Sequence, residues 1–277
     1  MERKSITGKL PTFPNALDFI VMAMWVFLSQ ILASRLCIMC GLELPDFTLA
    51  NSADDQVSLW AQLSMAQTLA VIYPAAMALS ILGLLIYRRL RGGTSKIAHF
   101  SIKGFDPSML LSAFVLMLAL QFVIEPLTEL MPEAPTTIGR GFFAVLVSVI
   151  FAPIFEEIIC RGIVLESFRA KYGIFAAWIW SSIFFGLIHA HLTAMFSAAI
   201  LGLVLGYVYL RSRSIFSVII LHALNNGLAL ALMAFGLNDS SFREAIPSTE
   251  IYWSVWVAAL LIVTIGSVVM VRRLRKI

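Results

Sequence analysis

The stretch Phe151-Ala-Pro-Ile-Phe-Glu156-Glu157-Ile-Ile-Cys160-Arg161-Gly162 places two adjacent carboxylates inside an otherwise apolar run, with an arginine one helical turn after the second. A charged side chain at bilayer depth costs between ~2.5 and ~17 kcal/mol, depending on how the cost is measured. Two such residues side by side are therefore expected to serve a function, and the surrounding sequence indicates which one.

The composition is that of a membrane protein. Of the 277 residues, 60% are hydrophobic and 13% are charged, and the mean hydropathy is +0.91. A soluble domain has about 45–50% apolar and about 25% charged residues. The three cysteines lie in or beside apolar segments, and Cys37-Ile-Met-Cys40 lacks the second pair that a zinc site would need, so we expect them to pack helices. The prediction is an all-α membrane protein with the lipid bilayer as its surroundings and no nucleic-acid partner.

Apolar segments predict a bundle of about eight transmembrane helices around an intramembrane cavity. Most segments have the ~20 residues that a helix needs to cross the bilayer. They cover residues 16–40, 59–87, 109–130, 141–160, 174–189, 192–210, 215–235 and 251–271. Most of the 20 lysines and arginines lie in alternate connections between these segments. This asymmetry predicts a multi-pass protein of the cell (plasma) membrane with both termini cytoplasmic.

We expect one membrane domain over residues 1–277. Within it, residues 1–107 contain helices without a recognisable motif, and residues 141–236 contain the helices that carry the polar motifs. Ala198, Gly202 and Gly206 recur at four-residue spacing, which predicts a face where two helices approach closely.

The two carboxylates are expected to differ. Residues four apart share a helix face, whereas adjacent residues point ~100° apart. Glu157 can therefore pair with Arg161, which leaves Glu156 directed elsewhere. A structural ion-pair network explains the first of these glutamates and leaves the second unexplained.

Histidines supply further candidates for chemistry. His189 ends the run Phe184-Phe185-Gly-Leu-Ile-His189, and His222 shares a helix face with Asn226 in His222-Ala-Leu-Asn225-Asn226. Together with Glu156, these residues could bind a metal, activate a water molecule or polarise a carbonyl. A single membrane histidine is often only an interhelical hydrogen bonder. His191 could substitute for His189, but it lies outside the Phe-x3-His spacing, and we interpret it as an interfacial hydrogen bonder. His99 lies in a basic connection, where we expect it to be solvated.

The ordered set Glu156-Glu157-x3-Arg161, Phe185-x3-His189 and His222-x3-Asn226 resembles the CAAX-protease and bacteriocin-processing (CPBP, Abi) family of intramembrane endopeptidases. The resemblance covers residues from about 150 to 230, and it implies a peptide or protein substrate at the membrane. It also implies that Glu156 activates water together with His189. His222 and Asn226 would stabilise the oxyanion, and Glu157, Arg161 and Phe185 would be supporting residues.

Two mechanisms stay open at this stage. In one, the protein is a glutamic protease without a cofactor. In the other, Glu156, His189 and His222 bind zinc and leave one position for water. Asn226 would be an unusual zinc ligand and fits an oxyanion site better.

Other classes of function remain as alternatives. Embedded glutamate and histidine could form the relay of a proton-coupled transporter, although the sequence has no inverted repeat or matching pair of broken helices. A non-catalytic scaffold or immunity membrane protein would also have this composition.

Two further embedded polar sites are expected to be structural. Asp18 lies near the end of the first segment and is expected to snorkel to the interface. Glu125-Pro126 is expected to kink the third segment and to pair locally.

Overall fold

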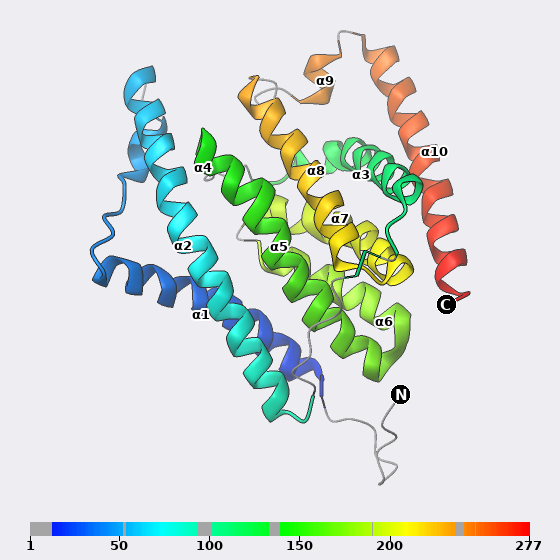
Figure 1. Ribbon diagram of the computed structural model, residues 1–277. Helices are drawn as coiled ribbons and strands as arrows, with labels where there is room; N and C mark the ends of the chain where they lie inside the picture. The colour runs from blue at the N-terminus through cyan, green and yellow to red at the C-terminus, as the bar shows by residue number, and fades with distance from the viewer. Residues whose placement is uncertain are drawn as a thin grey trace.

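The computed structural model describes residues 13–51, 54–93, 101–102, 104–132, 139–189, 191–235, 241–246 and 248–277. His99 lies outside these residues. The described part consists of helices and contains no strand, as the composition predicted. Figure 1 shows a bundle in which α1 and α2 lie at one edge and α10 lies at the other, next to α3.

The long α-helices are α1 (Ala16–Met39), α2 (Asp55–Leu90), α3 (Pro107–Thr128), α6 (Glu166–Leu187), α7 (Leu192–Ser212), α8 (Ile215–Ala234) and α10 (Thr249–Leu274). The short ones are α4 (Phe142–Val145), α5 (Ala152–Glu157) and α9 (Phe242–Ala245), and a 3₁₀ turn, η1, covers Phe47–Asn51. Two π-helical segments, η2 (Leu146–Phe151) and η3 (Ile158–Leu165), lie on either side of α5.

Seven described helices are long and apolar enough to cross a membrane. One of them, Phe142–Leu187, has 46 residues and covers most of both the fourth and the fifth predicted segments. Gly173 interrupts it with φ 82° and ψ −176°, a conformation available essentially to glycine alone. Beyond this break α6 folds back, so that Phe185 contacts Arg161.

The core lies where η3, α6 and α7 pack together. Ile159, Ile163, Leu205 and Val208 are fully or almost fully buried there. The predicted small-residue face of α7 lies against α6, because a Cβ atom added at Gly202 would lie 3.1 Å from Ser182 Cα. Small residues allow this close approach of two helix backbones.

An ion pair joins α1 to α2. Asp18 is completely buried, accepts a hydrogen bond of 2.6 Å from the Tyr87 hydroxyl and pairs with Arg91 Nε at 2.8 Å. The expectation that Asp18 snorkels to the interface is therefore wrong. An arginine just beyond the end of α2 reaches the carboxylate, so that the carboxylate can stay inside the bundle.

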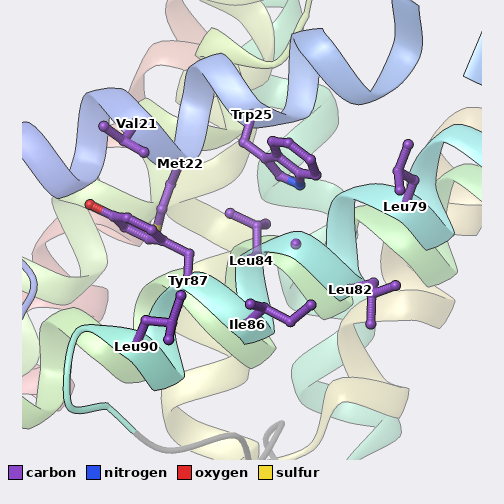
Figure 2. Close-up of a pocket in the computed structure, with 10 residues that line it drawn as sticks. Val21, Met22, Trp25, Leu79, Leu82, Leu84, Ile86, Tyr87 and Leu90 are labelled. Carbon is purple, nitrogen blue, oxygen red and sulfur yellow. The ribbon is translucent and has the colours of Figure 1, made fainter. Parts of the chain in front are cut away.

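The same two helices enclose an apolar hollow of about 380 Å³. In Figure 2, Met22 and Trp25 extend from α1 towards Leu84 on α2. The indole ring of Trp25 lies on Gly83, where an added Cβ would come within 2.1 Å of the ring. A glycine is needed at this position for α1 and α2 to approach.

Glu125 also pairs differently from what its sequence predicted. Its carboxylate accepts hydrogen bonds from the backbone N–H of Phe242 and from the Tyr252 hydroxyl, the latter at 3.0 Å. Phe122, Phe242 and Tyr252 pack their rings together beside it. The contacts are long-range, and they attach α9 and α10 to α3.

Candidate active site

The carboxylate pair lies on an irregular part of the long helix. α5 carries Glu156 and Glu157 between the two π-helical segments, and Pro153 occupies its first turn. Proline has no backbone N–H and cannot make the usual helical hydrogen bond, which favours a widened turn before it. π-helical turns are rare and frequently occur at functional sites.

Glu157 is the centre of a buried polar cluster. Its Oε1 accepts from Arg161 Nη1 at 3.0 Å and lies 2.9 Å from His222 Nδ1. Arg161 also donates to the backbone oxygen of Gly202 at 3.0 Å, and its guanidinium lies over the Phe185 ring at 4.7 Å. Glu157 and Arg161 are both fully buried. The cluster links η3, α6, α7 and α8, so it fixes the position of His222.

Glu156 faces a different set of residues. Its Oε1 accepts a hydrogen bond of 2.7 Å from the Tyr73 hydroxyl on α2. Its Oε2 lies 4.0 Å from His222 Nε2. This oxygen is buried and has no hydrogen-bond partner among the described residues. The carboxylate is therefore held by one oxygen, and the other is left for a ligand.

Both predicted histidines pack against the ring of Phe185. The Phe185 ring is 5.1 Å from the ring of His189 and 5.4 Å from the ring of His222, and both contacts are edge-on. His189 Nδ1 lies 2.7 Å from the backbone oxygen of Phe185. No hydrogen bond or ion pair joins His189 to Glu156 within the described residues. Joint action of these two residues stays a prediction.

Asn226 is oriented by its neighbours. Its Nδ2 donates to the backbone oxygen of Ser148 at 3.0 Å, and its Oδ1 accepts from Asn225 Nδ2 at 3.4 Å. Asn225 in turn accepts from Gln121 Nε2 at 2.8 Å. Because an amide nitrogen carries two hydrogens, one N–H of Asn226 is available to a ligand.

A metal ion was one of the predicted options. Across the described ranges, no group of three or more His, Cys, Asp and Glu side chains is arranged to hold one. Glu156 and His222 are near each other, but His189 does not join them in a ligand set. The residues as placed do not fit the predicted zinc site.

Sequence reasoning missed three residues that hold the site. Tyr73 bonds Glu156, Ser148 accepts from Asn226, and Gln121 bonds Asn225. A tyrosine in the middle of an apolar helix, away from the interface where tyrosine is usual, was the available signal for the first. The Ser148 contact uses a backbone oxygen and leaves no trace in the sequence.

The fold and the site define a class: a multi-pass helical membrane protein with a buried carboxylate, two histidines and an asparagine near one another. Residues 138–228 match the family model described as "Type II CAAX prenyl endopeptidase Rce1-like". This region contains every predicted site residue, and its match agrees with the CAAX-protease resemblance that its motifs predicted.

One curated protein is similar to part of this chain. Over 82 residues, 30% of this chain, the sequence is 34% identical to the Bacillus subtilis (strain 168) protein named "Putative membrane peptidase YdiL". The match spans 34% of that protein's length. No solved structure matches the chain at a significant level.

Proposed function

We propose that the protein is an intramembrane endopeptidase that hydrolyses a peptide bond with a water molecule activated by Glu156. The family of residues 138–228 and the relative's name both support a membrane peptidase. The observation that carries the proposal is Glu156 Oε2, a buried carboxylate oxygen without a hydrogen-bond partner among the described residues, 4.0 Å from a histidine nitrogen.

Glu156 acts as the base in this proposal. Its free oxygen takes a proton from water as the water oxygen attacks the carbonyl carbon of the substrate, and the C–N bond then breaks. The same proton passes to the leaving amine, so the carboxylate is regenerated. Tyr73 holds the other oxygen and aims the carboxylate at the water. His189, which packs against the Phe185 ring, assists Glu156 in activating the water.

His222 and Asn226 stabilise the oxyanion. Ionised Glu157 can only accept hydrogen bonds, so Nδ1 of His222 carries a proton that points at Glu157. His222 can therefore donate from Nε2 only when both ring nitrogens are protonated. Because the transferred proton passes through Glu156 to the leaving amine, His222 gains no proton in this step. It is doubly protonated from the outset when it donates, and Glu157 stabilises that positive charge. The remaining N–H of Asn226 supplies the second donor.

The test uses purified protein in proteoliposomes with a library of quenched-fluorescent peptides, half of them carrying a farnesylated C-terminal cysteine motif. Mass spectrometry of the products should show hydrolysis of one peptide bond. Cleavage should persist after treatment with a chelator, because the donor set does not fit a metal site. Loss of cleavage on chelation with recovery on added zinc would contradict this metal-free mechanism. Failure of folded protein to cleave any peptide would contradict the assignment as a peptidase.

A further inference from the structure

A second cavity lies beside the candidate active site, between α3, α7 and α8. It has a volume of about 540 Å³, far more than the ~30 Å³ that one water molecule takes up in the liquid. We call it the α3–α8 cavity. Its polar lining residues are Gln121, Glu125, Thr128, Ser197, Asn225 and Ser241.

Several of these polar groups have unused hydrogen-bonding capacity. Gln121 uses one N–H on Asn225, and its side-chain oxygen has no partner among the described residues. The Ser197 hydroxyl likewise has no hydrogen bond in the described part of the chain. A lipid acyl chain cannot satisfy such groups, whereas water and a peptide backbone can.

The cavity extends along α3 from its last residue, Thr128, back to the middle of the helix. Gln121 is seven residues before Thr128, the last residue of α3, which corresponds to ~10 Å along a helix. Polar residues at this depth in a spanning helix are tolerated where they line a water-filled cavity or are buried in protein.

A chain of hydrogen bonds connects the cavity to the candidate active site. Gln121 donates to Asn225 at 2.8 Å, and Asn225 donates to Asn226 at 3.4 Å. Asn225 lines the cavity, and Asn226 is the proposed oxyanion donor one residue later on the same helix. A ligand in the cavity that contacts Asn225 is therefore one hydrogen bond away from Asn226, the group that would hold the scissile carbonyl.

The apolar hollow between α1 and α2 differs from the α3–α8 cavity in the chemistry of its lining (Figure 2). Apart from the Tyr87 hydroxyl, which bonds Asp18, and the indole N–H of Trp25, its lining is hydrocarbon. That hollow suits lipid tails and the α3–α8 cavity does not.

We propose that the α3–α8 cavity is hydrated and binds a hydrophilic segment of the peptide substrate next to Asn226. Whether the cavity is hydrated does not depend on the proposed endopeptidase function, whereas the choice of a peptide as its ligand rests on that function. The amide and hydroxyl groups of Gln121, Ser197 and Asn225 would pair with the peptide backbone.

Cysteine accessibility tests hydration without any activity measurement. Cys37 and Cys40 are replaced by alanine, and the buried Cys160 is kept, so that the parent protein sets the background. Ala229 lines the cavity, whereas Ala231, two residues along α8, does not, and both are exposed. In proteoliposomes, a charged methanethiosulfonate should modify Ala229→Cys roughly tenfold faster than Ala231→Cys, because the thiolate needs water to form. Equal rates at the two positions, whether fast or slow, would overturn the proposal.

The same two variants test the ligand. Modification of Ala229→Cys should block peptide cleavage, and modification of Ala231→Cys should leave it unchanged. Fast modification at 229 without loss of cleavage would overturn the peptide site and leave only a water-filled cavity. If no peptide is cleaved by any variant, the endopeptidase function fails, while the labelling rates still decide whether the cavity is hydrated.

Discussion

At the scale of single residues, Glu157 has a structural role that can be measured as stability. It neutralises Arg161, and both side chains are completely buried. Removing one partner of a buried ion pair leaves an uncompensated charge and costs about 3–5 kcal/mol. We therefore expect Glu157→Leu to lower the thermal unfolding temperature strongly in detergent.

The double variant Glu157→Leu/Arg161→Met is the control for this prediction. Replacing both charges by apolar side chains removes the unpaired charge and should restore much of the lost stability. A double variant less stable than Glu157→Leu alone would show that Arg161 is not held mainly by Glu157.

Tyr73 gives a second prediction at this scale. Tyr73→Phe removes the hydrogen bond to Glu156 Oε1 and lets the carboxylate turn. We expect kcat for peptide cleavage to fall about tenfold, equivalent to about 1.4 kcal/mol, with KM unchanged.

Tyr87→Phe is the matched control, since Tyr87 on the same helix donates a similar hydrogen bond to Asp18, outside the site. It should leave kcat unchanged. An equal loss in both variants would mean that Tyr73 acts through stability and does not orient Glu156.

Residue types and spacing predicted that the two glutamates, Arg161 and His222 belong to one site, but not how each of them is held. The four-residue spacing predicted the contact of Glu157 with Arg161, which the structure contains. It could not predict that Glu157 also bonds His222, because that contact depends on the rotation of α8 against α5. The Asp18 expectation failed for a related reason: the identity of its partner, Arg91, is decided by how α1 and α2 pack.

At the scale of the elements, the break at Gly173 makes a prediction about backbone strain. An added Cβ at Gly173 would meet nothing within 4 Å, so any cost of Gly173→Ala comes from the backbone conformation and not from a clash. That conformation costs of order 1–3 kcal/mol for other residues. We expect the variant to unfold at a lower temperature than the parent protein.

Gly227→Ala is the comparison within α8. Gly227 has helical geometry, and an added Cβ would meet Val149 at 3.8 Å, an ordinary contact. This variant should be neutral or up to ~1 kcal/mol more stable, because glycine is the poorer helix former. Equal melting temperatures for the two variants would show that alanine adopts the backbone conformation at position 173 without strain.

Apolar periodicity and length predicted most elements, but they described the helix around the site incompletely. The segments 141–160 and 174–189 were expected as separate helices. In the structure the chain is helical from Phe142 up to the break at Gly173. The π-helical turns on either side of α5 were not predicted, because hydropathy and spacing are almost the same for α- and π-helical turns.

At the scale of the whole molecule, the break at Gly173 decides the topology. A straight helix of 46 residues would be ~69 Å long, more than twice the ~30 Å hydrocarbon core. The segment should therefore cross twice, which gives eight crossings and places both termini on the same side. In Figure 1, the chain turns back within the segment labelled α6.

Reporter fusions at the two ends check this prediction. A fluorescent protein that matures only in the cytoplasm should be bright at either terminus, and alkaline phosphatase should be inactive at both. Signals from opposite sides would indicate that Phe142–Leu187 crosses once.

Glu156 is the residue on which the proposed reaction depends most, and one comparison tests its role directly. Cleavage rates are measured in proteoliposomes for the parent protein, Glu156→Gln and Glu166→Gln. Glu166 is a carboxylate on the same long helix that is paired with Arg169 and Arg213, away from the site. We predict that Glu156→Gln abolishes cleavage while the protein stays folded, and that Glu166→Gln retains it. Cleavage by Glu156→Gln at the parent rate would contradict the assignment of Glu156 as the base.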